Sequence, residues 1–313
     1  MSARVLVTGG SGFIGSQVVI RLADEPGVER VVSVDVAPGP VGHSIRSVEM
    51  DVRDPRLADL IDEEGIDRVV HLAAIVTPRP HHTREFLYEV DVGGTTNVTA
   101  AALAGAVRHL TVMSSGAAYG YHADNPEWLD ETDPLRGNSE FAYSHHKRLV
   151  EEHLERLRHE HPGLGQLVLR SGTVLGDTVD NQITALWEWP VILGISGSVA
   201  PFVFVWDEDV VEIIVRGTVS MASGIFNVAG DGAVPLPDIA AELGKRYVAV
   251  PAGLVKGALA LLNRVGFSPY GPEQVDFLRH RPVLSNRRLR EEFGYRPAKT
   301  SIEAFRAWKA SRG

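Results

Sequence analysis

The sequence contains no cysteine, which excludes disulfide bonds and thiolate metal ligands and suits a reducing compartment. Basic residues are not in excess, and the formal net charge of −9 argues against a general nucleic-acid partner, which would need a basic surface. Long apolar runs are also missing, since residues 258–262 are far too few to cross a bilayer. The first predicted strand starts almost at Met1, which leaves no room for a signal peptide. We therefore expect a cytoplasmic protein without nucleic-acid or membrane partners.

Glycine, by contrast, follows a specific pattern near the N-terminus. Residues 4–16 predict a buried strand, a glycine-rich turn and the start of a helix. Glycines in such a turn allow a tight bend, the approach of a pyrophosphate, and close packing of helix on strand. The helix N-terminus then offers free N–H groups and a positive dipole end to the phosphates. The residues predicted to contact a dinucleotide here are Gly9, Gly12, Phe13, Ile14 and Gly15.

An acidic residue follows at the distance that this interpretation requires. Asp35 lies 20 residues after Gly15, at the end of a second apolar run, where a carboxylate can hydrogen-bond the adenosine ribose. Its charge would repel a 2′-phosphate, and no arginine follows before Arg46, so NAD is favoured over NADP. Asp51, after the third predicted strand, either lies near the adenine or caps its loop. The predicted cofactor-binding set is completed by Val52, Leu72 and the small pair Ala73 and Ala74.

Predicted strands and helices alternate along most of the chain. This spacing predicts an α/β fold with a doubly wound parallel sheet. We expect residues 1–173, joined by residues 201–228, to form a dinucleotide-binding domain. Residues 174–200 and 229–313 are expected to form a smaller, mainly helical substrate-binding lobe. The predicted strands after the first two are 44–50, 68–75, 110–115, 166–170, 201–205 and 224–228, and the main predicted helices are 55–64, 83–103, 141–159 and 207–220.

A tyrosine and a lysine four residues apart form the second informative group. Tyr143 and Lys147 share one face of a predicted helix. An ammonium beside a phenol stabilises the phenolate and lowers the tyrosine pKa from about 10 toward the range that acid/base catalysis needs. Ser115 ends a predicted strand, at the edge where ligands of open α/β sheets bind. A serine hydroxyl there can hold the substrate oxygen that the tyrosine protonates or deprotonates.

Together these motifs resemble the extended short-chain dehydrogenase/reductases of the NAD-dependent epimerase/dehydratase type. The resemblance covers essentially the whole chain and implies a Rossmann fold with about seven parallel strands. It also implies, by analogy, a homodimer formed through helices 83–103 and 141–159. The segments that carry the resemblance are residues 9–15, 114–120, 143–147, 202–210 and 226–230.

The resemblance further implies roles for individual residues. The nicotinamide of NAD would lie between Ser115 and Tyr143. Tyr143 would be the acid/base, Lys147 would bind the nicotinamide ribose, and Ser115 would orient the substrate oxygen. A hydride would then pass between the substrate carbinol carbon and the nicotinamide.

Departures from the family pattern bear on the substrate. Family members that act on nucleotide sugars usually carry an asparagine where this chain has Thr173, and often an arginine just before the strand that here follows Ala200. Ala117 stands where dehydratases hold an acid, which disfavours dehydration of a sugar. Asp91 replaces the asparagine that usually opens a helix motif ending in Gly-Thr. These differences lean slightly toward a substrate other than an ordinary nucleotide sugar.

Two aromatic residues complete the candidate substrate-binding set. Trp187 lies in an unusually apolar segment, residues 186–194, and Trp206 follows further on. They either form the wall of a pocket for a hydrophobic substrate or pack between the lobes. The candidate substrate-binding residues are thus Ala117, Thr173, Trp187 and Trp206.

The remaining charged residues suggest less. A late basic run either meets a diphosphate or forms a solvated face. The histidine pairs at 81–82 and 145–146 are not arranged with carboxylates as a metal site, so no metal is predicted. The arginines of the run are Arg279, Arg281, Arg287, Arg288 and Arg290.

We therefore predict an NAD-dependent enzyme with a small-molecule substrate, a secondary alcohol or ketone. Two reactions remain open: net oxidation or reduction, and epimerisation of a nucleotide sugar with tightly held NAD. A rival of a different class is a non-catalytic NAD-binding regulatory protein. The presence of Ser115, Tyr143 and Lys147 speaks against that rival.

Overall fold

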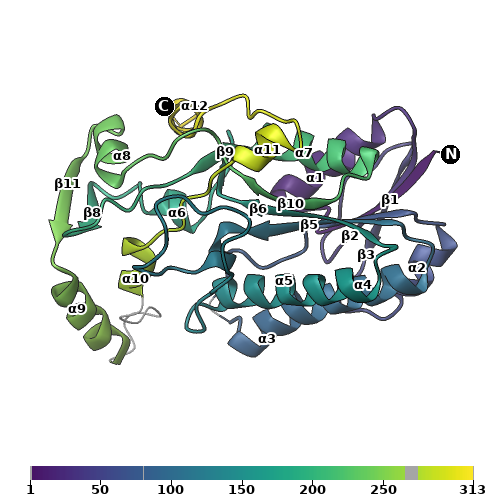
Figure 1. Ribbon diagram of the computed structural model, residues 1–313, viewed down its shortest axis with the longest axis horizontal. Helices are drawn as coiled ribbons and strands as arrows, with labels where there is room; N and C mark the ends of the chain where they lie inside the picture. Colours follow the sequence, from purple (N-terminus) through teal and green to yellow (C-terminus); the bar gives the residue numbers. More distant parts are fainter. Residues whose placement is uncertain (1, 80, 265–273, 313) are drawn as a thin grey trace.

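The computed structural model of the chain describes residues 2–79, 81–264 and 274–312 (Figure 1). Its centre is a seven-stranded sheet in the order β3-β2-β1-β4-β5-β6-β10, in which all neighbouring strands are parallel. The predicted doubly wound α/β fold is therefore confirmed. The strands of this sheet are β1 (Ala3–Thr8), β2 (Val28–Asp35), β3 (Ile45–Glu49), β4 (Arg68–His71), β5 (His109–Ser115), β6 (Gly165–Ser171) and β10 (Gly224–Val228).

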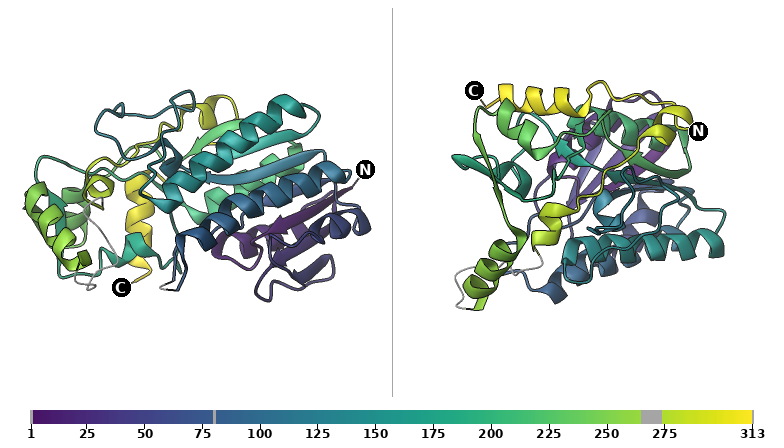
Figure 2. Two further views of the ribbon diagram at one scale, coloured as in Figure 1. Left: turned by 90° about the horizontal axis from the view of Figure 1, so that it is seen from below. Right: turned by 60° about the vertical axis from the view of Figure 1, so that its left-hand side comes forward.

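Helices cover both faces of the sheet (Figures 1 and 2). α1 (Phe13–Ala23) and α7 (Asp207–Ser220) pack against each other on one face. α4 (Gly94–Ala104) and α5 (Ala142–Glu160) run side by side along the other, where α2 (Leu57–Glu63) joins α4. The inner strands are consequently buried on both faces, which explains why they read as continuous apolar runs, whereas the edge strand β3 is partly exposed.

The predicted single helix 83–103 is divided into three parts. α3 (Arg84–Tyr88) leads into a π-helical turn, η1 (Glu89–Gly93), which is followed by α4. A π turn is wider than an α turn and is frequent at functional sites. The buried Asp91 lies in this turn, and its side chain has polar partners on two other segments. These tertiary contacts favour a local geometry that the helical pattern of the sequence did not predict.

A smaller lobe follows at one end of the sheet (Figure 1). It is mainly helical, as predicted, but β8 (Val191–Ile195) and β11 (Arg246–Val250) form a parallel pair that joins its two segments. The predicted strand 201–205 is shifted to β9 (Phe204–Trp206), which pairs with β7 (Thr173–Leu175). The helices of this part are α6 (Gln182–Ala185), α8 (Leu236–Glu242), α9 (Ala252–Arg264), α10 (Gln274–Arg279) and α12 (Ser301–Ala310), whereas α11 (Arg287–Glu291) packs against β10 of the central sheet.

The topology defines where a ligand can bind. β1 and β4 are neighbours, but α1 and α4, which follow them along the chain, cover opposite faces (Figure 1). A crevice forms at the carboxyl ends of strands where the connections diverge in this way. The glycine-rich turn, the alanine pair and Ser115 follow or end the strands at this edge. Within the described ranges, no helix is both long and apolar enough to cross a membrane.

Candidate active site

The three glycines predicted in the turn after β1 differ in how closely other atoms surround them. Gly9 has a φ of +71°, and a Cβ there would lie 2.7 Å from the backbone nitrogen of Ala73. A Cβ on Gly15 would lie 1.9 Å from the carbonyl oxygen of Gly9, so α1 can pack this closely only with glycine. Gly12 is exposed and precedes α1 without a capping side chain. The turn therefore leaves an open helix N-terminus, which fits a pyrophosphate.

Asp35 lies at the end of β2 and contacts the same turn. Its carboxylate accepts hydrogen bonds from the backbone N–H of Ser11, at 3.0 Å, and of Ala37, at 3.3 Å. Asp51 is instead bound by Arg53, whose guanidinium holds the pKa of this carboxyl below its usual range. The contacts favour the ribose-binding interpretation of Asp35 and the loop-capping alternative for Asp51.

The other predicted cofactor residues have different surroundings. The N–H of Leu72 donates to Thr8 O at 3.1 Å, and Ala73 lies against Gly9. Val52 is buried and packs in the core between the sheet and α4. The side chains of Phe13 and Ile14 pack against hydrophobic cores, so a phosphate at this turn would meet their backbone. Ala74 follows Ala73 and is half-buried.

Ser115, Tyr143 and Lys147 come together where β5 meets α5. Nζ of Lys147 donates to Met113 O at 2.8 Å and lies 5.7 Å from the centre of the Tyr143 ring. The hydroxyl of Ser115 acts on the Tyr143 phenol and lowers the pKa of that phenol. The structure thus assembles the three residues that the sequence placed 28 and four positions apart.

Burial dominates the electrostatics of this group. It raises the pKa of the Tyr143 phenol to about 12, against the effect of Ser115. It also lowers the pKa of Lys147, while the carboxylates of Asp91 and Glu151 act in the opposite direction. Both neutral forms are thus favoured relative to water. A positive charge beside the Tyr143 ring, in addition to Lys147, would lower the pKa of the phenol.

A buried chain of polar side chains lies behind the candidate site. His71 contacts Thr8 Oγ1 through Nδ1, at 2.7 Å, and Thr95 Oγ1 through Nε2, at 2.9 Å. Burial lowers the pKa of His71 to about 3, so this ring is neutral. The Thr95 hydroxyl donates to Asp91 O, and the Asp91 carboxylate contacts His146. Sequence analysis noted Asp91 as a departure but missed these partners, which are far apart along the chain.

Two of the candidate substrate-binding residues, Ala117 and Thr173, lie in different parts of the structure. Ala117 is in a 3₁₀ turn, η2 (Gly116–Tyr119), where its N–H donates to Ser115 Oγ at 3.2 Å and its carbonyl accepts from Ser144 Oγ at 2.7 Å. Thr173 begins β7, and its N–H donates to Val203 O at 3.0 Å. Ala117 thus adjoins the candidate catalytic serine, whereas Thr173 connects the sheet to the lobe.

The two tryptophans have different surroundings. Trp206 lines a cavity of about 390 Å³ beside the glycine-rich turn, together with Gly12 and Asp207. Trp187 is 2% exposed and packs edge-to-face against four aromatic rings, which favours the packing alternative for this residue. The partners of Trp187 are Phe202, Phe204, Phe305 and Trp308, with ring centroids 5.0–5.8 Å away.

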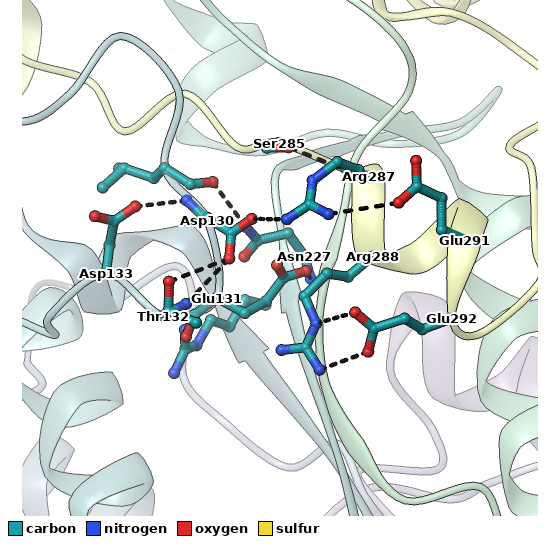
Figure 3. Close-up of polar contacts among 12 residues, drawn as sticks. Asp130, Glu131, Thr132, Asp133, Asn227, Ser285, Arg287, Arg288, Glu291 and Glu292 are labelled. Carbon is teal, nitrogen blue, oxygen red and sulfur yellow. Dashed lines mark hydrogen bonds and ion pairs between the residues drawn. The ribbon is translucent and has the colours of Figure 1, made fainter.

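Most of the late arginine run is engaged in ion pairs at the surface (Figure 3). Arg287 bridges Asp130, at 2.9 Å, and Glu291, while Arg288 makes a bidentate pair with Glu292 at 2.7 and 2.8 Å. Arg290 likewise pairs with Asp231 at 3.1 Å. These pairs support the solvated-face alternative for this part of the run.

Arg281 differs from these three ion-paired arginines. Its guanidinium lies 4.0 Å from the centre of the Phe202 ring and 4.8 Å from that of Phe277. Burial lowers its pKa, and in the described part of the chain its Nη1 atom has no hydrogen-bond partner. Burial also raises the pKa of Tyr121 to about 12, with smaller effects from Arg281 and Tyr143. Arg281 is therefore a desolvated cation, and it affects the pKa of Tyr121, as Tyr143 does in the opposite direction.

The histidines of each predicted pair contact each other through their rings. His81 and His82 contact each other edge-to-face, with ring centroids 4.5 Å apart. Within the described ranges, no three side chains of metal-ligating types gather closely enough to hold an ion.

Comparisons with known proteins agree with the geometry. Residues 5–228 match the NAD dependent epimerase/dehydratase family. A protein of Mycobacterium tuberculosis (strain ATCC 25618 / H37Rv), Uncharacterized protein Rv0501, is 28% identical over 317 residues, which cover 99% of this chain and 84% of that protein. The L-arabinose 1-dehydrogenase (NAD(P)(+)) of Haloferax volcanii is 34% identical over 216 residues, 60% of this chain and 78% of that enzyme. The crystal structure of the UDP-glucose 4-epimerase of Thermus thermophilus in complex with NAD has a TM-score of 0.73 at 25% identity, covering 99% of each chain.

The chain therefore belongs to the NAD-dependent epimerase/dehydratase family. It is an NAD-dependent enzyme, and the predictions of the family, the Rossmann fold and the cofactor are confirmed.

Proposed function

We propose that this enzyme transfers a hydride between NAD and the carbinol carbon of a secondary alcohol, or the corresponding ketone, with Tyr143 as acid/base. The observation that supports this reaction is the assembly of Ser115, Tyr143 and Lys147 at the carboxyl end of β5, beside the crevice. A hydroxyl, a phenol and an ammonium at one point match the needs of carbonyl–alcohol interconversion.

Each of the three residues has a distinct task in this reaction. The bound NAD supplies the hydride acceptor. During oxidation the Tyr143 phenolate takes the proton of the substrate hydroxyl, while Ser115 Oγ donates a hydrogen bond to the same oxygen. Lys147 binds the nicotinamide ribose and stabilises the phenolate by its charge. During reduction the phenol returns the proton to the developing alkoxide.

The cofactor is held by backbone at one end and by a carboxylate at the other. The open N-terminus of α1 at Gly12 receives the pyrophosphate. Asp35 receives the adenosine ribose and, by its charge, disfavours the 2′-phosphate of NADP. The segment 72–74 borders the nicotinamide half. Residues 1–173 with 201–228 form the cofactor-binding domain, and the rest of the chain forms the substrate lobe.

A second candidate, a nucleotide-sugar epimerase, is favoured by one observation. The guanidinium of Arg281 lies over the rings of Phe202 and Phe277, and it can pair with an anionic group of a substrate. In an epimerase the hydride leaves and returns to the opposite face, so the cofactor is regenerated without release. A dimer through α4 and α5, whose outer faces lie along one side of the molecule, suits either reaction (Figure 2).

Two measurements test these proposals. Purified protein is denatured, and any released nucleotide is identified by mass and redox state. Stoichiometric NAD favours the epimerase cycle and directs screening to nucleotide sugars, whereas a protein without bound cofactor favours a dehydrogenase and a panel of secondary alcohols and ketones. NADP in place of NAD would show that the role of Asp35 is wrong.

The Tyr143→Phe variant then tests the acid/base. We expect kcat to fall by about 10²-fold or more, with NAD affinity changed little. Tyr247→Phe, in the distant strand β11, is the matched control. Unchanged kcat in Tyr143→Phe would reject Tyr143 as the acid/base.

A further inference from the structure

Asp91 connects two segments that hold opposite sides of the candidate active site. Its Oδ1 accepts from the N–H of Ile75, just after the alanine pair that follows β4, at 3.0 Å. Its Oδ2 lies 2.9 Å from Nδ1 of His146 in α5. The two side chains are only 4% and 1% exposed. Because a carboxylate can only accept, Nδ1 of His146 carries the hydrogen of this bond.

The hydrogen bonds behind this pair have a definite direction. The Thr95 hydroxyl donates its one hydrogen to Asp91 O at 2.6 Å, so it can only accept from His71. His71 therefore carries its hydrogen on Nε2, and its free Nδ1 accepts from Thr8, the residue before Gly9. A buried hydrogen-bonded network of this kind favours one arrangement of the elements that it joins. Here it runs from the glycine-rich turn to the catalytic helix.

The position of His146 in α5 links this network to the chemistry. It lies three residues after Tyr143 and one before Lys147, in the first turns of the helix. We propose that Asp91 and His146 form a positioning pair, which holds Tyr143 and Lys147 in register with the cofactor-facing segment after β4. The proposal rests on the proposed function, and it adds two residues that act through Tyr143 and Lys147 without touching the substrate.

The charged and titratable groups around the pair come from four elements. Asp91 from η1 and Glu151 from α5 both support the protonated form of Lys147. His71 from β4 is neutral, and the Lys147 charge helps to keep it so. The rings of Tyr88 from α3 and His145 from α5 lie 5.7 and 6.2 Å from that of His146. Asp91 also opposes the ionisation of the Tyr143 phenol.

An asparagine at position 91 would separate positioning from charge. Its Oδ1 could still accept from Ile75, and its Nδ2 could donate to Nδ1 of the other His146 tautomer. Asp91→Asn thus keeps the hydrogen bonds and removes the charge. Asp91→Ala removes both. His146→Asn places an amide nitrogen near the site of Nδ1 and keeps the bond to Asp91, whereas His146→Leu removes it.

The test combines a readout of Lys147 with the kinetics. The chain has five lysines, so the titration of Lys147 can be followed by NMR with lysine labelled at Cε, and its signal is identified by Lys147→Met. We expect the Lys147 midpoint to fall in Asp91→Asn, because a neutral amide no longer supports the ammonium. We expect kcat to fall about tenfold or more in Asp91→Ala and His146→Leu, with little change in KM for NAD, and His146→Asn to retain most of the activity.

Asp209→Asn provides the matched control. Asp209 is also a buried carboxylate with two hydrogen bonds, from Tyr295 Oη and Ala298 N–H at 2.8 Å, but it lies in α7 on the opposite face of the sheet. A Lys147 midpoint and a kcat in the Asp91 and His146 variants that match those of Asp209→Asn would overturn the proposal. The Lys147 titration needs no substrate, so it tests the pair even if Tyr143→Phe rejects the proposed reaction.

Discussion

Nζ of Lys147 lies over the Tyr143 ring, 5.7 Å from its centre and one helical turn further along α5. The same atom is anchored to Met113 O at 2.8 Å, so the ammonium is held inside the site. Burial is the main cause that raises the pKa of Tyr143 to about 12, far above neutral pH, even with this ammonium in place. We propose that the anchored ammonium of Lys147 stabilises the phenolate of Tyr143 during the reaction.

Replacing Lys147 by methionine should shift the pH dependence of the reaction. Without the cation the phenolate is less stable, so the pKa of Tyr143 rises and less phenolate is present at any given pH. The rate of alcohol oxidation, which increases as pH rises through this pKa, should therefore increase only at higher pH in Lys147→Met. At pH 8 we expect kcat to fall about 10²-fold. Lys256→Met, at a surface ion pair with Asp276, should keep the profile of the wild type, and coincident profiles for both variants would contradict this role.

The glycines of the turn should separate folding from cofactor binding. A Cβ at Gly15 would meet Gly9 O at 1.9 Å, so Gly15→Ala should destabilise the fold by about 1–3 kcal/mol and weaken NAD binding. At Gly12 a Cβ meets only the same oxygen, at 3.3 Å. Gly12→Ala should therefore fold normally but bind NAD at least about tenfold more weakly, because its methyl group occupies the proposed pyrophosphate position. Urea unfolding and NAD titration distinguish the two, and equal NAD affinity in Gly12→Ala and wild type would argue against this site.

His71 should make stability fall in mild acid. Its pKa is about 3 in the folded chain against about 6.5 when unfolded, so between these values the unfolded state binds more protons. The stabilisation is complete above pH 6.5 and is lost as pH falls, by about 2 kcal/mol between pH 6.5 and 5.

Replacing His71 by asparagine, which does not titrate, should remove this component. The free energy of unfolding of His71→Asn should decrease less steeply from pH 7 to 5 than that of wild type, as measured with urea. The pKa values of His109 and His153 are also lowered, but these residues are present in both wild type and His71→Asn. The difference between the two curves therefore measures the contribution of His71. Parallel curves would show that His71 is not the buried neutral group.

The two neighbouring tryptophans of the lobe should respond very differently to alanine. Trp187 is 2% exposed among aromatic rings, whereas Trp189 is 60% exposed. Trp187→Ala should cost about 3–5 kcal/mol of stability through lost contacts and a cavity, while Trp189→Ala should cost little. Thermal unfolding provides the measurement. If Trp187→Ala is stable and has an altered substrate preference, Trp187 forms the wall of the substrate pocket and the packing alternative is wrong.

The features that the sequence predicted well are local ones. The turn at Gly9, Gly12 and Gly15 and the helix at 207–220 can be read from short patterns of glycine and of apolar spacing, because backbone geometry imposes them. The helix 83–103 was predicted as continuous, since its pattern contains no sign of the contacts that favour the π turn around Asp91. The pairing of β8 with β11 was missed for the same reason, because it joins segments far apart in the chain.

The sequence by itself determined the family, the cofactor and the three residues proposed for the reaction, because a hydride-transfer site of this type is built from short motifs at strand ends. Only the tertiary structure decided which partners and which degree of burial the remaining candidate residues have. It placed His146 against Asp91, it buried Trp187, and it separated Arg281 from the ion-paired arginines. The physical reason is that burial and electrostatic partnership depend on how helices and lobe pack over the sheet, and residues distant in sequence become neighbours only then.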